Sequence, residues 1–232
     1  MLANRDITVT IPYYNREKYI DEAIRSVQAK SRKPLQIIIV NDGSRESLRR
    51  YLDRYRSECT IVHLDKNVGA AAARNEGNNR ASATFVAFLD DDNVRLPHKL
   101  EVQGQYMEDH PRCGAVHSAP WASFSGQEDV RWNRDWSGPI TLAQALTDGY
   151  FASMPTTLVR RDVLSAFGGL DPKFPIAEER DSLPCVRFFG AFCVARAQPV
   201  NASSHTLFQD AVGGRNPLHY RPAPEAQPYS AS

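Results

Sequence analysis

Short apolar runs and amphipathic stretches alternate along the N-terminal half of the chain. Four runs rich in β-branched or aromatic residues predict strands over 7–11, 35–40, 60–64 and 84–89. Between them, apolar residues recur at helical spacing at Tyr19, Ile20, Ala23, Ile24 and Val27, and again at Leu48, Tyr51, Leu52 and Tyr55. Gly69 and the alanines after it predict a third helix. This alternation predicts an α/β fold with a Rossmann-like, largely parallel sheet and helices on both faces.

The second half of the chain has a weaker pattern. It predicts short helices at 141–146 and 161–167 and a strand at 156–159. The pattern fades after Val194, and the stretch from Arg221 onward is rich in Pro, Ala and Ser. We therefore expect a single domain over residues 1–200 and an irregular tail over 201–232, without fixed structure from about Arg221.

Polar clusters follow three of the predicted strands, at the point where each strand ends. They are Pro12-Tyr13-Tyr14-Asn15, Asn41-Asp42-Gly43-Ser44 and Asp90-Asp91-Asp92-Asn93. In a parallel sheet, ligands bind beyond the C-terminal strand ends, where these clusters would converge. Purely structural explanations remain open, such as a packed ring at Tyr14 or a turn at Asp42 with Ser44 capping the next helix. The convergence itself favours a binding site.

The three consecutive aspartates close an apolar run. Carboxylates this close repel one another unless a cation or a set of donors neutralises them. Mg²⁺ and Mn²⁺ prefer oxygen ligands and often bridge protein carboxylates to substrate phosphates. The alternative is a polar turn that caps a helix. Three acids after this strand favour a metal site that handles phosphate.

Charge and cysteine content narrow the class of protein. The 28 basic and 27 acidic residues nearly cancel, which gives no sign of nucleic-acid binding. The four cysteines are scattered without metal-ligand spacing, as is typical of a reduced protein. The N-terminus lacks the layout of a signal peptide, and no apolar run has transmembrane length. We expect a cytoplasmic protein, and peripheral contact with the inner face of the cell membrane stays open.

Together these segments resemble the family 2 glycosyltransferases of the GT-A fold. The resemblance rests on the phrase at Pro12, the Asp-Gly-Ser phrase at Asp42, the phrase Asn-x-Gly-x-x-x-Ala-Arg-Asn-x-Gly that starts at Asn67, and the acidic run, in that order. It is good over about residues 7–100 and continues weakly through 155–161 and 167–171. It implies a nucleotide-sugar-binding half over 1–118 and an acceptor half over 119–200.

The resemblance also implies roles for individual residues. Tyr14 would lie against the donor base, and Asp42 would recognise the base edge. Asp92 would hold Mn²⁺ or Mg²⁺ as part of an Asp-x-Asp motif. The residues expected to bind the donor are Pro12, Tyr14, Asn15, Asp42, Arg74, Asp90 and Asp91.

The expected catalytic base lies in the acceptor half. Inverting members of the family often use an Asp that is preceded by Glu and followed six residues later by Arg. Asp181 and Arg187 have this spacing, although Arg180 stands where the Glu is expected. Glu178 and Glu179 are close by and stay as alternatives. Asp181 is therefore the predicted base that takes the proton of the acceptor hydroxyl.

The implied activity is metal-dependent, inverting sugar transfer from a nucleotide-diphosphate donor, with a preference for UDP. The acceptor would be a saccharide or lipid-linked saccharide in bacterial surface polysaccharide or glycoconjugate synthesis. The alternative is a nucleotide-sugar-binding module or partner subunit without turnover, which Arg180 and the atypical tail suggest. A dinucleotide oxidoreductase is disfavoured because no Gly-x-Gly-x-x-Gly follows the first strand.

Overall fold

The N-terminal part of the chain folds as its hydrophobic pattern predicts. The computed structural model describes residues 6–118 and 154–172 with their side chains, and the backbone of five strands at 121–124, 130–131, 138–140, 193–196 and 204–208. Four parallel strands come first: β1 (Ile7–Tyr13), β2 (Gln36–Asn41), β3 (Thr60–His63) and β4 (Phe85–Phe88). Helices α1 (Glu17–Gln28), α2 (Glu46–Asp53) and α3 (Ala70–Arg80) connect them.

The rest of the described chain adds shorter strands and two further α-helices. In chain order they are β5 (Asn93–Arg95), α4 (Lys99–Asp109), β6 (Cys113–His117), β7 (Trp121–Phe124), β8 (Val130–Arg131), β9 (Gly138–Ile140), the 3₁₀ helix η1 (Met154–Thr156), β10 (Thr157–Arg160), α6 (Arg161–Ala166), β11 (Cys193–Arg196) and β12 (Ser204–Phe208).

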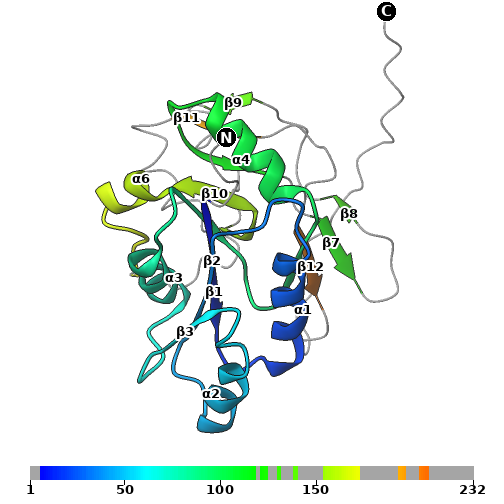
Figure 1. Cartoon of the computed structure of the whole chain (residues 1–232), viewed down its shortest axis with the longest axis vertical. Coiled ribbons are helices and arrows are strands. Elements are labelled where there is room, and N and C mark those ends of the chain that lie inside the picture. The colour runs from blue at the N-terminus through cyan, green and yellow to red at the C-terminus, as the bar shows by residue number, and fades with distance from the viewer. Residues whose placement is uncertain are drawn as a thin grey trace, which may run out of the picture.

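The described strands form two sheets (Figure 1). The larger sheet has the order β3-β2-β1-β4-β10-β6-β11-β9, and the smaller has the order β5-β12-β7-β8. In the larger sheet β10 runs antiparallel to both β4 and β6, whereas β11 is parallel to β6. The predicted α/β fold with a largely parallel sheet is therefore confirmed, and β1 lies between β2 and β4.

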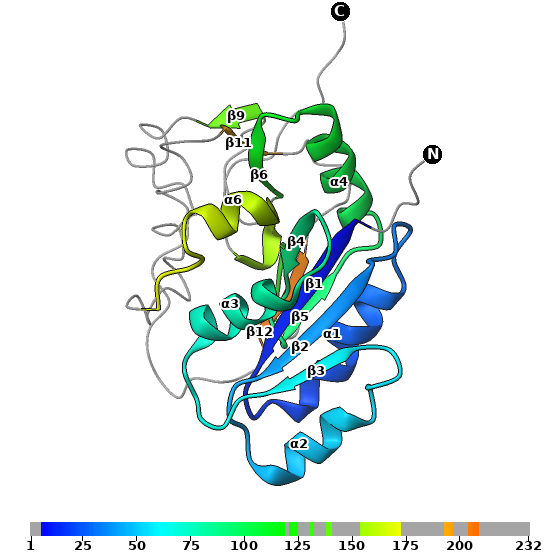
Figure 2. The ribbon, with the colours of Figure 1, turned by 60° about the vertical axis from the view of Figure 1, so that its left-hand side comes forward.

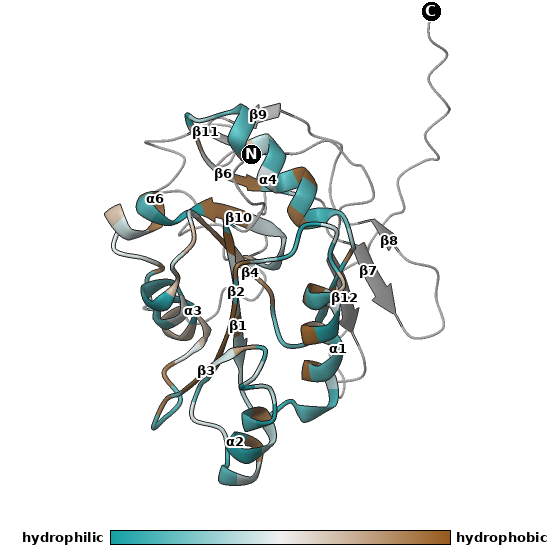
Figure 3. Cartoon of the chain, viewed as in Figure 1, coloured by the Kyte–Doolittle hydropathy of each residue, from teal (hydrophilic) through white to brown (hydrophobic). Residues whose placement is uncertain are grey.

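Helices cover both faces of this sheet (Figure 2). The main core joins α1, α2 and α4 to one face, and Ile20, Ile24 and Leu52 are fully buried in it. Helix α3 covers the other face, where Ala73 packs with Ile38 and Val40. Figure 3 shows hydrophobic colour on the central strands and on part of α1 and α2, as expected for helices with one apolar stripe.

Helix α3 approaches the sheet unusually closely. A side chain at Gly77 would collide with the side chain of Thr10 on β1. Only a residue without a Cβ allows this contact. The position of α3, and of the loop that leads into it, is therefore fixed directly by β1.

The sequence pattern missed several of the described elements, among them β5, α4 and β6, and β12 lies inside the stretch 201–232 that was expected to be irregular. Helix α4 buries Lys99, Gln103 and Gly104 beside Leu100 and Met107, so its buried face is not an apolar stripe. Strand β6 is mostly small residues and ends in a buried histidine. Both patterns lack the signals that predict helices and strands.

Other predictions differ at their ends or are not tested. The predicted strand 156–159 is β10, shifted by one residue and preceded by the 3₁₀ turn η1, and the predicted helix 161–167 is α6. The predicted helix 141–146 and the tail from Arg221 lie outside the described residues. None of the described helices combines the length and the apolar composition that crossing a bilayer requires.

Candidate functional site

The strand ends that carry the polar clusters meet at one edge of the sheet. Because β1 lies between β2 and β4, the turns after these three strands are neighbours. The backbone N–H of Tyr14 donates to Asp91 Oδ2 at 3.4 Å, and the N–H of Asn15 donates to Ser44 Oγ at 3.1 Å. The structure thus brings together the three clusters that the sequence pointed to.

The turn after β1 exposes one tyrosine and buries its neighbour. Tyr13 is fully buried in the core, whereas Tyr14 is 46% exposed. Asn15 follows with φ of 55°, a left-handed conformation that asparagine tolerates better than most residues. Pro12 is half-buried within β1, opposite Val40 of β2. The ring of Tyr14 is therefore free to stack on a planar ligand.

Asp42 holds the loop that leads into α3. Its carboxylate is buried and accepts the backbone N–H groups of Val68 at 2.7 Å and Gly69 at 3.0 Å. Gly43, with φ of 72°, lets the turn pass so close to this loop that a side chain there would collide with the backbone at Lys66. The structural alternative had Ser44 capping the next helix, but α2 has no side-chain cap, and Ser44 Oγ accepts the N–H of Asn15 instead.

Arginines hold the acidic run. Asp90 receives a hydrogen bond from the buried Arg74, whose Nη2 is 2.6 Å from its Oδ1. Arg16 lies between the other two acids: its Nη1 is 3.5 Å from Asp91 Oδ1 and forms an ion pair with Asp92 Oδ2. Arg16 comes from the turn after β1, and its side chain is 47% exposed. A cationic group therefore already occupies the space that Asp91 and Asp92 share.

Asp91 has a strongly perturbed carboxyl group. Burial raises the pKa of its carboxyl to about 7. The charge of Arg16 opposes this rise, and the charges of Asp92 and Asp90 add to it. A carboxyl in this position gains strongly from any nearby cation.

Three basic side chains lie buried close to the acidic run. Lys30, Arg95 and Lys99 are each at most 5% exposed, and within the described chain no carboxylate forms an ion pair with them. Lys30 donates to the carbonyl of Arg95, Arg95 donates to the carbonyl of Phe88, and Lys99 donates to Gln103. Burial lowers the pKa of Lys30 to about 7 and that of Arg95 to about 9, while the charge of Asp90 acts against the second shift. No pattern in the sequence indicated this cluster.

The acidic run offers oxygen ligands for a metal, but not a complete site. Among the described residues, no three His, Cys, Asp or Glu side chains lie close enough to hold a metal ion. Asp91 and Asp92 nevertheless face one guanidinium nitrogen, so their oxygens point to common space. Mg²⁺ is commonly held by one or two carboxylates, substrate phosphates and water. The residues present fit that kind of shared site.

Part of the predicted site is not tested by these contacts. Asp181, Glu178, Glu179 and Arg187 lie outside the described residues. Arg16 was missed because nothing in its local sequence links it to acids 75 and 76 residues away. The sequence feature that could have pointed to Arg16 as a site residue is its position two residues after Tyr14, in the same turn.

Comparison with known proteins places this geometry in a family. The family model described as glycosyl transferase family 2 matches residues 8–168. The amylovoran biosynthesis glycosyltransferase AmsE of Erwinia amylovora is 35% identical over 109 residues, which is 45% of this chain and 41% of that protein. An uncharacterized glycosyltransferase of Nostoc sp. is 29% identical over 195 residues, which is 79% of this chain and 60% of that protein.

Solved structures share the fold. S. aureus TarS in complex with UDP-GlcNAc has a TM-score of 0.74 and 19% identity, covering 89% of this chain and 60% of that chain. The complex of TarS with UDP has a TM-score of 0.72. At this identity the likeness concerns the fold alone. The chain spans less than two thirds of the length of these curated relatives, from 14% of one relative to 60% of another.

Proposed function

This chain belongs to glycosyl transferase family 2, and we propose that it transfers a sugar from a nucleotide-diphosphate donor to an acceptor hydroxyl. The observation that carries the proposal is the meeting of Tyr14, Asp42 and the acidic run at one sheet edge. The UDP and UDP-GlcNAc complexes of TarS support a UDP-sugar as the donor. AmsE, named for amylovoran synthesis, supports a role in bacterial surface polysaccharide or glycoconjugate synthesis.

The nucleotide would lie across the turns after β1 and β2. The exposed ring of Tyr14 would stack on the base, with Pro12 and Asn15 shaping the turn around it. The oxygens of Asp42 already accept two backbone N–H groups, yet a carboxylate has about four lone-pair sites and can accept another bond from the base. Asp42 would thus hold the loop and contact the base at once.

The diphosphate would lie over the acidic run. Asp92 would be the protein ligand of Mn²⁺ or Mg²⁺, and Asp91 or Asp90 would lie near the ribose. A bound divalent ion would neutralise the charge that develops on the diphosphate leaving group. Arg74 keeps Asp90 in place, and Arg16 can turn from the carboxylates toward the phosphates because its side chain is half exposed.

Asp181 would be the general base of an inverting transfer. Its carboxylate would take the proton from the acceptor hydroxyl as the new glycosidic bond forms, a contribution of about 10²–10⁴-fold in rate. The acceptor would be a saccharide or a lipid-linked saccharide, reached at the cytoplasmic face of the membrane. The support is the six-residue spacing between Asp181 and Arg187.

A screen of nucleotide sugars with and without Mn²⁺ tests the donor half of the proposal. We expect metal-dependent binding of a UDP-sugar by calorimetry. Asp181→Asn then tests the acceptor half: donor binding and melting temperature should persist while transfer is lost. Full transfer by Asp181→Asn would move the role of base to Glu178 or Glu179.

A second candidate is a nucleotide-sugar-binding module or partner subunit without turnover. Arg180, in the place where the family usually has Glu, favours it. The two candidates differ in one measurement, since only an enzyme would hydrolyse or transfer the bound sugar with Mn²⁺. Binding without either reaction, across the donors and acceptors tried, would favour the module.

A further inference from the structure

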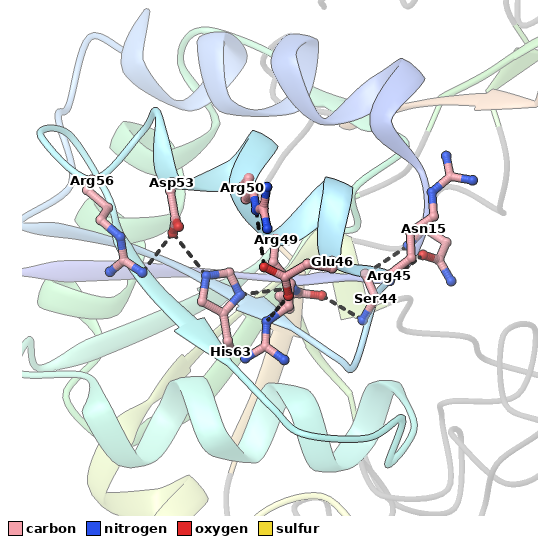
Figure 4. Close-up of polar contacts among 10 residues, drawn as sticks. Asn15, Ser44, Arg45, Glu46, Arg49, Arg50, Asp53, Arg56 and His63 are labelled. Atoms are coloured by element: carbon pink, nitrogen blue, oxygen red, sulfur yellow. Dashed lines mark hydrogen bonds and ion pairs between the residues drawn. The ribbon is translucent and has the colours of Figure 1, made fainter.

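A chain of hydrogen bonds leads from helix α2 toward the candidate site (Figure 4). His63 ends strand β3 and lies opposite Asn41 in the register of β2 and β3. Its Nδ1 is 2.9 Å from Asn41 Nδ2, and its Nε2 is 3.0 Å from Asp53 Oδ1. Arg56 also contacts Asp53, at 2.7 Å. The imidazole, only 13% exposed, therefore joins an outer helix to the second strand of the sheet.

The direction of these bonds follows from Asn41. This residue is fully buried, and its Oδ1 accepts the backbone N–H of Ser44 at 3.0 Å. Its Nδ2 is therefore the group that faces His63, and an amide nitrogen only donates. Nδ1 of His63 must accept, so the ring proton lies on Nε2 and is donated to Asp53.

Ser44 carries the connection into the site. Its Oγ accepts the N–H of Asn15 at 3.1 Å, and Asn15 Oδ1 accepts the N–H of Arg45 at 3.2 Å. Asn15 needs such support because its backbone is left-handed. Ser44 lies in the same turn as Asp42, after β2. Asn15 lies in the same turn as Tyr14, after β1. The network therefore ends at both residues proposed to bind the base.

We propose that His63 is a positioning residue for donor binding. It holds the amide of Asn41, and through Ser44 it fixes the two turns that present Tyr14 and Asp42 to the nucleotide. It touches neither the nucleotide nor the sugar. This inference rests on the proposed function, because the ligand that benefits from the fixed turns is the nucleotide of the donor.

Two substitutions separate positioning from plain stability. In His63→Asn, a side-chain oxygen can lie near the place of Nδ1 and accept from Asn41, but the side chain is too short to reach Asp53. In His63→Val, which suits a strand, both contacts are lost. Both variants should melt at a lower temperature than the wild type, because both lose the bond to α2, and His63→Val should melt lowest because it also leaves the buried Asn41 Nδ2 without an acceptor. UDP binding is therefore measured well below both melting temperatures, where both variants are folded. Only His63→Val should bind UDP with Mn²⁺ roughly three- to tenfold more weakly, the effect of one lost hydrogen bond.

The measurement is calorimetric titration of UDP with Mn²⁺ into the full chain. Equal affinities of His63→Val and His63→Asn, or wild-type affinity in both, would overturn the inference. Absence of UDP binding by the wild type would count against the proposed function instead. The positioning role then has its own readout: amide hydrogen exchange at Asn15 and Ser44 should be faster in His63→Val than in His63→Asn, and equal rates would overturn it.

Discussion

Asp42 and the Asp91–Asp92 pair lie beyond strands that flank β1, yet their charges are balanced in different ways. Asp42 accepts two backbone N–H groups, which cannot leave without opening the loop that leads into α3. Asp91 and Asp92 share Arg16, a long side chain that is 47% exposed. A carboxylate held by backbone is part of the framework. A carboxylate held by an exposed guanidinium can exchange that cation for another.

Under the proposed function, this difference would give the two regions separate tasks. The turn after β2 is held by backbone hydrogen bonds, which suits recognition of a rigid base. The acidic run keeps its charge available, which suits a metal and a diphosphate that arrive and leave in each cycle. The expected effects of substitution should therefore differ in kind, with stability lost in one region and metal-dependent binding lost in the other.

The largest effect is expected for Asp92→Asn. Removing this charge should abolish Mn²⁺-dependent binding of UDP, because the shared site has few protein ligands. The free energy of unfolding should change little, since the relief of repulsion within the acidic run offsets the lost ion pair with the exposed Arg16. Calorimetry and urea unfolding measure the two quantities, with Asp109→Asn as a control of equal charge at the far end of α4. Retained Mn²⁺-dependent affinity would remove Asp92 from the metal site.

Asp42→Ala should lower stability as well as the affinity for UDP, because Asp42 holds the loop into α3 and is proposed to contact the base. The buried N–H groups of Val68 and Gly69 would lose their acceptor, which costs roughly 1–3 kcal/mol in the free energy of unfolding. Urea unfolding of Asp42→Ala and Asp92→Ala side by side checks the contrast. If the two alanine variants are equally stable, the distinction between framework and exchangeable charge is wrong.

Tyr14→Ala should weaken UDP binding without loss of stability. Stacking of an aromatic ring on a base contributes roughly 1–3 kcal/mol in nucleic-acid systems, and we expect the same scale here. The ring is 46% exposed, so its removal leaves no cavity in the core. Tyr14→Phe keeps the ring and should keep the affinity. Normal UDP binding by a folded Tyr14→Ala protein would place the base elsewhere.

The smallest effect is expected for Arg16→Gln, measured with Mn²⁺ alone. Removing the guanidinium should raise the affinity for the metal by roughly two- to fivefold, the scale of an exposed ion pair. Arg45→Gln, which breaks the exposed pair with Glu17, is the matched control. Weaker Mn²⁺ binding by Arg16→Gln would show that this arginine supports the metal site and does not compete with it.

The family and the first four strands could be predicted because their signals are local. Buried parallel strands are continuous apolar runs, and the family phrases follow them at fixed places in the chain. The family model over residues 8–168 confirms the resemblance, and the predicted meeting of the strand ends is seen in the contacts of Tyr14 and Asn15. The roles of the site residues and the domain boundaries stay predictions.

What could not be predicted depends on pairs distant in sequence. Strand β1 runs two residues beyond its predicted end at Ile11, because Pro12 and Tyr13 pair with β2, and this extension carries Tyr13 into the core. In α4 the buried Lys99 donates to Gln103, and Gln103 donates to the carbonyl of Thr156. Thr156 lies far from α4 in the chain, so the polar sequence of α4 does not indicate that the helix packs in the core. Arg16 meets its acids only after the sheet has formed.

The contact of Gly77 with Thr10 links the loop held by Asp42 to the acidic run. Helix α3 begins at the loop that Asp42 holds and carries Arg74, which holds Asp90. A larger residue at position 77 would wedge this helix away from β1 and disturb both sets of contacts at once. Neither region can therefore change independently through this helix, and a substitution at Gly77 should disturb the support of Asp42 and of Asp90 together.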